Sequence, residues 1–233
     1  MPTDLFFSLG QLWAIGGSGS ATQSVEVGWQ VYPAHYQGDY APHLFVYWTA
    51  DNYGTTGCYN LDCGAFVQVS TTLVAGQQVA ASATNGTQVE GTLAFYKDPT
   101  YLNWYLFQQN SDGTYTMLGY YPIGLFGSGQ LSQYATTLLY GGETILYNPY
   151  VGLFQVPMGS GIDPSFSSPP EIGQVAYQRG LKYMGVNGVL ADFPSNGTFS
   201  DCGYGLANGF GANTSYGATS CWGTWIFFGG PGC

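Results

Sequence analysis

Two glutamates stand out because of what surrounds them in the sequence. Glu26 lies in the alternating run Ser24–Val31 and is the only charged residue between Asp4 and Asp39. Glu143 follows two glycines in another strand-like run and also has no cation near it. Two carboxyl groups that share a proton can activate water and protonate a leaving group, which is the chemistry of hydrolases that work in acid. The residue pattern alone also allows the alternative that both are ordinary solvent-facing strand residues.

The other reactive side chains offer few routes to catalysis. The two histidines, His35 and His43, have no nucleophile motif beside them. The string Gly16–Ser20 lacks the full nucleophile-elbow form and precedes a strand, so we interpret it as a flexible loop. The chain has no phosphate-binding loop and no dinucleotide fingerprint. The remaining glutamates, Glu90 and Glu171, are expected to be exposed.

The charge balance excludes some partners. Among 233 residues there are three Lys/Arg and 13 Asp/Glu, which gives a formal net charge of −10. Nucleic acids and anionic membranes attract proteins through clustered cations, so we expect neither as a partner. Few positive charges would accumulate in acid, and the fold should therefore tolerate low pH.

Five cysteines in an acidic chain indicate an oxidising compartment, and we expect a secreted, extracellular protein. The cysteine spacings and the two histidines do not suit zinc, so we expect no metal and no cofactor. No apolar run approaches the roughly 20 residues that span a bilayer. The first residues do not resemble a signal peptide, and we expect that a signal and any pro-segment have been removed. Sequons at Asn85, Asn196 and Asn213 would carry glycans only in a eukaryotic secretory pathway.

Strands must position the two glutamates, since no stretch longer than ten residues keeps a clean helical period. In residues 24–31, Val25, Val27, Trp29 and Val31 share one face, and Ser24, Glu26, Gly28 and Gln30 share the other. Gly28 would leave room beside Glu26 for a ligand backbone. Further strands are predicted at residues 43–49, 65–72, 88–97, 103–109, 115–121, 138–147, 174–181 and 223–228, with turns at 52–54, 85–86, 97–99 and 111–113. This spacing predicts an all-β antiparallel sandwich, which we expect to be a monomer with a single domain over residues 1–233.

Several short strings occur in a fixed order along the chain. They are Gln23–Trp29, Phe45–Asp51, Thr56–Gln68, Tyr96–Pro99 with Asn103-Trp104, Gly119–Pro122, Leu125-Phe126, Gly141–Glu143, Pro157–Gly161 and Phe227–Gly232. Together they resemble the neprosin family of proline-directed glutamic peptidases, from about Gln11 to the C-terminus. The resemblance implies a β-sandwich of two large antiparallel sheets, one of them concave and carrying an active-site cleft. It also implies cleavage after proline at acidic pH, often in proteins made with an N-terminal pro-segment.

The resemblance implies roles for particular residues. The catalytic glutamates of the family match Glu26 and Glu143, and the short family disulfide matches Cys58 and Cys63. Cys202 resembles the cysteine that pairs with the C-terminal one, here Cys233. This leaves Cys221, which is either free or the partner of Cys233 in place of Cys202.

Three other side chains are candidates for the site. Tyr59 and Gln68 are possible donors to a tetrahedral oxyanion, or surface polar residues of a sheet. Trp48 is a candidate wall of a proline pocket, or a core residue. Trp29 points away from Glu26 by alternation, and we expect it in the core.

The sequence therefore predicts a secreted acid endopeptidase that hydrolyses bonds after proline in peptides or proteins. Glu26 and Glu143 would share one proton, and the pattern does not tell which acts as base. One alternative is a carbohydrate-active or carbohydrate-binding β-sandwich, although the carboxylate clusters usual in one strand of such proteins are missing. Another is a non-catalytic secreted domain with the same fold.

Overall fold

The structure is a computed structural model, which describes residues 6–146, 156–164, 172–194, 205–212 and 221–231, with backbone only for 205–212 and Cys221. Its strands are β1 (Phe6–Gly16), β2 (Gln23–Val31), β3 (His43–Thr49), β4 (Cys58–Tyr59), β5 (Val67–Gln68), β6 (Thr92–Lys97), β7 (Trp104–Gln109), β8 (Tyr115–Tyr121), β9 (Thr137–Leu146), β10 (Ala176–Met184), β11 (Leu190–Asp192), β12 (Gly205–Ala212) and β13 (Cys221–Gly229). Short 3-10 helices span Gly19–Ala21, Ile123–Phe126 and Gln130–Ser132. No helix among the described residues is long and apolar enough to cross a membrane.

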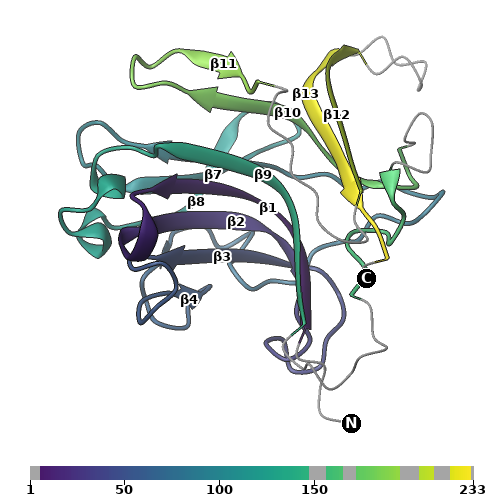
Figure 1. The fold of residues 1–233 in the computed structure, drawn as a ribbon, viewed down its shortest axis with the longest axis horizontal. Helices are drawn as coiled ribbons and strands as arrows, with labels where there is room; N and C mark the ends of the chain where they lie inside the picture. The colour runs from purple at the N-terminus through teal and green to yellow at the C-terminus, as the bar shows by residue number, and fades with distance from the viewer. Residues whose placement is uncertain (1–5, 147–155, 165–171, 195–204, 213–220, 232–233) are drawn as a thin grey trace.

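The strands form three antiparallel sheets. The first sheet has the order β4-β3-β2-β1-β9, and the second has the order β5-β8-β7-β6. The third sheet, with the order β11-β10-β13-β12, comes from the C-terminal part of the chain. Figure 1 shows β3, β2, β1 and β9 side by side, with β7 and β8 in a layer behind them. The predicted all-β antiparallel class is confirmed, and the third sheet adds to the two that were expected.

The first two sheets pack face to face around the main core. Val25 and Val27 of β2 are fully buried in it, as the alternation of residues 24–31 predicts. The same cluster contains Leu106 of β7 and Leu118 of β8, which are also fully buried. This arrangement is a β-sandwich, and it leaves the other face of β2, which carries Glu26, pointing away from the core.

Strand β1 was not among the predicted strands. It lies between β2 and β9, so both of its edges and much of both faces are covered. Ala14 packs into the sandwich core, whereas Phe7 and Leu9 belong to a second apolar cluster on the other face. A strand that is covered on both faces has no alternation of polar and apolar residues, which explains why the pattern missed it.

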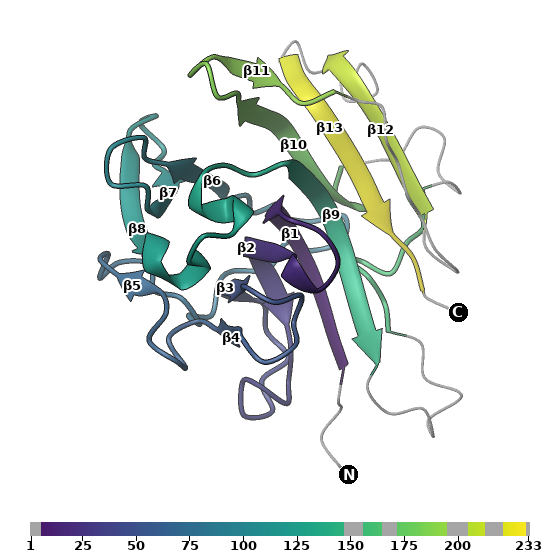
Figure 2. The same ribbon diagram turned by 60° about the vertical axis from the view of Figure 1, so that its left-hand side comes forward.

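The third sheet packs against the back of β1 and β9. Phe228 of β13 is buried there with Met158 in an apolar cluster that Tyr140 of β9 joins. A side chain at Gly142 would come within 2.6 Å of Phe228, so only glycine permits this approach. Figure 2 shows the third sheet as a separate group of strands beside β9.

Candidate functional site

The two glutamates lie on the same face of the first sheet. Glu26 of β2 is opposite Trp13 of β1, and Glu143 of β9 is opposite Leu9 of β1. Residues that pair across antiparallel strands point to the same side, and Leu9, Gln11 and Trp13 alternate along β1. The side chain of Gln11 therefore stands on this face midway between the two glutamates.

The Gln11 side chain contacts both carboxyl groups. With its nitrogen turned to Glu26, the amide donates to Oε2 at 3.3 Å, and its oxygen accepts from the indole N–H of Trp13 at 2.8 Å. In the opposite orientation the amide nitrogen donates to Glu143 Oε2 at 3.4 Å. The first orientation satisfies both ends of the amide, which is 1% exposed. One buried amide thus lies within hydrogen-bonding distance of both acids.

Two hydroxyl groups donate to the other oxygen of Glu26. Ser24, two residues earlier on the same strand face, donates to Oε1 at 2.6 Å. Tyr53, from the turn that follows β3, donates to the same oxygen at 2.7 Å. Short hydroxyl-to-carboxyl bonds of this kind are strong and fix the orientation of the acceptor. The position of Glu26 is therefore set from three separate segments of the chain.

Burial changes the proton affinity of both acids. Glu26 is 5% exposed, and desolvation raises its pKa to about 7 against the lowering effect of the Ser24 and Tyr53 hydrogen bonds. The negative charge of Glu143 raises it further. Burial also raises the pKa of Glu143. Both groups therefore hold their protons to higher pH than an exposed glutamate does.

Aromatic rings surround the pair on this face. Tyr47 of β3 is opposite Glu26, and its ring lies 4.7 Å from that of Tyr59 on β4. Phe45 and Trp13 belong to the same apolar cluster. Burial, and next the charge of Glu26, raise the pKa of Tyr47. The face is thus an aromatic surface with two carboxyl groups set into it.

The cations of the chain are engaged elsewhere. Arg179 binds Glu90 through two nitrogens, at 2.7 and 2.5 Å, and Lys182 binds Asp192 at 2.7 Å. Lys97 donates to a backbone carbonyl oxygen and lies over the ring of Trp104. Within the part of the chain that the structure describes, no cation pairs with either site glutamate. Glu90 is exposed, as expected, and it binds Arg179 and Tyr177.

A model of the neprosin family matches residues 5–231 of this chain. The chain belongs to the neprosin family. The match covers nearly all of the 233 residues and therefore includes both glutamates and every element described above. Neprosin membership indicates a hydrolase of the peptidase type, and it favours that class over the carbohydrate-active alternative.

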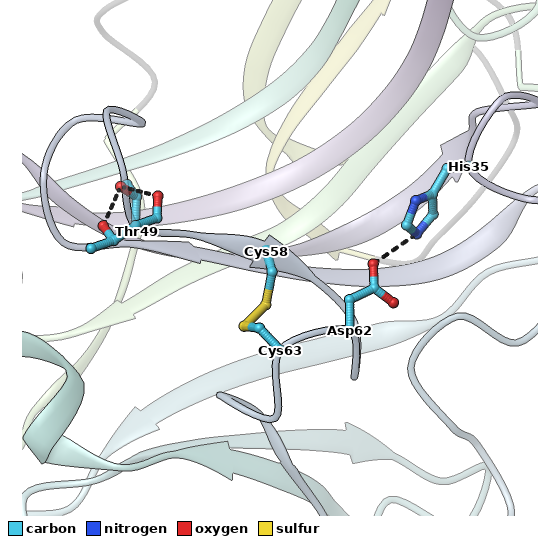
Figure 3. The surroundings of a disulfide bond; sticks show 6 residues. His35, Thr49, Cys58, Asp62 and Cys63 are labelled. Carbon is cyan, nitrogen blue, oxygen red and sulfur yellow. Dashed lines mark hydrogen bonds and ion pairs between the residues drawn. A yellow bond between two sulfur atoms is a disulfide. The ribbon is translucent and has the colours of Figure 1, made fainter.

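The short disulfide expected from the neprosin resemblance is present. Cys58 and Cys63 are bonded, and the bridge closes the loop that follows β4. Figure 3 shows the bridge between Thr49, at the end of β3, and the pair His35–Asp62. In that pair His35 Nε2 lies 3.7 Å from Asp62 Oδ2. Cys202 and Cys233 lie outside the described residues, so their predicted pairing and the state of Cys221 stay predictions.

Two predicted site residues do not lie near the glutamates. Trp48 is on the opposite face of β3, where it is 8% exposed and packs against Phe126 in the sandwich core. Gln68 is in the second sheet, and its amide donates to three backbone carbonyls, those of Ser70, Leu73 and Leu118. Both side chains are placed to stabilise the fold and not to contact a ligand beside Glu26.

Tyr59 lies on the face that carries the glutamates, as the candidate role requires. Its hydroxyl accepts a hydrogen bond from Gln30 at 3.3 Å, and its ring packs against that of Tyr47. The space expected beside Gly28 is filled, since a side chain there would collide with the carbonyl of Gly10 and lie 2.7 Å from Gln11 Cα. Gly28 therefore serves the close approach of β1, which brings Gln11 between the acids.

Three residues of the site were not predicted from the sequence. Ser24 was placed on the face of Glu26, but no role was assigned to it. Gln11 sits in the strand that the pattern missed. The sequence predicts a turn that contains Tyr53, and only the fold shows that this turn reaches Glu26. Among the described residues, no group of three or more His, Cys, Asp or Glu could hold a metal ion.

Proposed function

We propose that this protein is a secreted endopeptidase that cuts after proline in acid, with Glu26 and Glu143 as its catalytic pair. The observation that supports the proposal best is the Gln11 amide, which lies within hydrogen-bonding distance of both carboxyl groups on one sheet face. Two acids held close together disfavour double ionisation, so one can keep its proton while the other is ionised. The neprosin match supports the peptidase class.

The reaction needs one proton on the pair. The ionised carboxyl takes a proton from a water molecule as its oxygen attacks the peptide carbonyl. The protonated carboxyl donates to the carbonyl oxygen and later protonates the leaving nitrogen. The Gln11 amide keeps both acids in place during these transfers, and Ser24 and Tyr53 hold Glu26.

The pKa shifts suit work in acid. Activity ends when the pair loses its last proton, and the pKa of about 7 at Glu26 sets this upper limit near neutrality. The aromatic surface of Tyr47 and Tyr59 offers flat faces for a pyrrolidine ring beside Glu26. It replaces Trp48, which lies in the core, as the candidate contact for proline.

The test is digestion of a denatured protein at pH 3–5, with mass spectrometry of the new C-termini. Wild-type protein should produce ends at proline, and Glu26→Gln or Glu143→Gln should lower the rate by about a thousandfold or more. Glu90→Gln is the matched control, because Glu90 pairs with Arg179 and is neither acid of the proposed pair. It should keep activity at pH 4.

Thermal melting at pH 4 would establish that each variant is folded. Full activity in either Glu26→Gln or Glu143→Gln would refute the pair. Peptides that end at residues other than proline would refute the specificity alone. No peptides at all from the wild-type protein would favour a binding domain with the same fold.

A further inference from the structure

The turn after β3 holds a tyrosine in an unusual backbone conformation. Asn52 and Tyr53 have φ of 56° and 61°, and Gly54 N donates to Asp51 O at 3.2 Å. Two left-handed central residues are typical of type I′ turns, which prefer glycine at the second of them. A tyrosine is disfavoured there because its Cβ crowds the following carbonyl. Since the turn alone favours glycine, a tyrosine at this position indicates that its side chain has a role of its own.

Asp51 anchors this turn through its carboxylate. The amide and hydroxyl of Thr55 donate to Oδ2 at 2.7 and 2.6 Å, and the hydroxyl of Thr56 donates to Oδ1 at 2.6 Å. The side-chain bonds from Thr55 and Thr56 hold the pKa of Asp51 well below its usual range. Asp51 therefore stays ionised, and keeps these bonds, at an acidity that protonates a carboxyl group of ordinary pKa.

The side chain of Tyr53 reaches from this anchored turn to Glu26. Its hydroxyl donates to Glu26 Oε1 at 2.7 Å, and its ring stacks on Tyr47 with centroids 5.9 Å apart and planes at 29°. The residue is 52% exposed although its hydroxyl meets a nearly buried carboxyl. One end of Tyr53 thus binds the acid, and the other faces solvent.

We propose that Tyr53 is a positioning residue, which the Asp51-anchored turn holds against Glu26 so that this carboxyl keeps one orientation. Ser24 binds the same oxygen from within the strand, and Tyr53 secures it from outside the sheet. The kinetic consequence rests on the proposed function, whereas the effect on Glu26 itself does not.

Among the described residues, four titratable groups interact electrostatically with Glu26. They are Glu143 from β9, Tyr47 from β3, Tyr53 from the turn and Tyr121 from β8 on the core side. The Tyr53 hydrogen bond lowers the pKa of Glu26, against the desolvation that raises it. Loss of the hydroxyl should therefore raise the pKa of Glu26 and leave that of Glu143 nearly unchanged.

The low glutamate content makes this measurable without any substrate. The chain has four glutamates, so glutamate labelled with ¹³C at Cδ gives four carboxyl signals, which Glu26→Gln and Glu143→Gln assign. In Tyr53→Phe the titration midpoint of Glu26 should rise by about one pH unit. The control Tyr115→Phe alters an exposed tyrosine of β8 and should shift no signal. An unchanged Glu26 midpoint in Tyr53→Phe would overturn the proposal.

The kinetic arm separates positioning from a structural role. Tyr53→Phe should lower kcat about tenfold with little change in KM, and Tyr53→Gly, which relieves the turn, should lower kcat at least as much without lowering the melting temperature. Asp51→Ala should lower kcat in the wild-type background but not further in Tyr53→Phe. Additive losses would contradict the proposal. If the wild-type protein cleaves nothing, the proposed function fails, and the titration still decides the role of Tyr53.

Discussion

The surroundings of the two site glutamates differ sharply. Glu26 lies on an inner strand, is nearly buried, and binds the hydroxyls of Ser24 and Tyr53 as well as the Gln11 amide. Glu143 lies on the edge strand β9 and is partly exposed, and its carboxyl lies within hydrogen-bonding distance of the Gln11 amide. Hydrogen bonds therefore hold Glu26 in one orientation, whereas Glu143 is more accessible to solvent.

This difference shows how one face can give two identical side chains different properties. Desolvation raises the proton affinity of the buried carboxyl of Glu26, although hydrogen-bond donors surround it. The partly exposed carboxyl of Glu143 keeps more contact with water. An asymmetric pair can hold one proton over a wide pH range, which a symmetric exposed pair would not do. The predictions below test this asymmetry, beginning with the largest expected effect on stability.

The largest effect should be the pH dependence that Glu26 imposes on folding. Its pKa is about 7 in the folded protein against 4.5 as the ordinary value. Because folding raises this pKa, the protonated Glu26 contributes stability that is fully present below pH 4.5. This contribution, about 3 kcal/mol in the free energy of unfolding, is lost as the pH rises through 7. Urea unfolding at pH 4 and pH 8 should show this loss in the wild-type protein, and Glu26→Gln should remove it.

Glu143→Gln is the matched comparison for that experiment. It should reduce the loss between pH 4 and pH 8 in the same direction, because burial raises the pKa of Glu143 also. Equal effects from the two variants would break the proposed asymmetry. Melting of the wild-type protein between pH 3 and 5 would contradict both this prediction and the acid tolerance expected from the charge balance.

A smaller effect should follow from Gly28→Ala on the Glu26 side. The new methyl group would collide with the carbonyl of Gly10 and lie 2.8 Å from Gln11 Cβ. We expect a loss of about 2 kcal/mol in the free energy of unfolding, because β1 must move away from β2. Chemical denaturation would measure it. An unchanged stability would mean that β1 is not held as closely as the register indicates.

The smallest effect should come from Gly141→Ala on the Glu143 side. Gly141 also pairs with Gln11, but no atom lies within 4 Å of the position that its Cβ would take. Its φ of 152° disfavours other residues, so we expect a cost of about 1 kcal/mol. The methyl group would stand on the open part of the face and should raise KM. A loss larger than that of Gly28→Ala would reverse the comparison.

Much of the frame around Glu26 could be predicted from the sequence. Strand β2 alternates because one face meets the core and the other carries polar groups, and this alternation is visible in residues 24–31. The β-sandwich class, the strand at Glu143 and the Cys58–Cys63 bridge were predicted as well. A local sequence pattern is sufficient to predict a strand when its two faces differ in polarity.

The rest of the site depends on contacts between distant segments. Gln11 was missed because β1 is covered on both faces and shows no alternation. Trp48 was a candidate although its neighbour Tyr47 is the residue opposite Glu26, and a shift of one position moves a side chain to the other face. Tyr53 could be placed in a turn, but its distance from Glu26 is set by the register of β2 and β3, which no local signal records.

The packing of Phe228 against Gly142 has a consequence for how the protein is made. Strand β13, which carries Phe228, follows every other described strand in the chain, yet it supports the back of the sheet that holds residues from the beginning. A chain emerging from the ribosome contains Glu26 and Glu143 long before this support exists. The two acids therefore reach their final setting only after β13 has been synthesised and Phe228 has packed against Gly142.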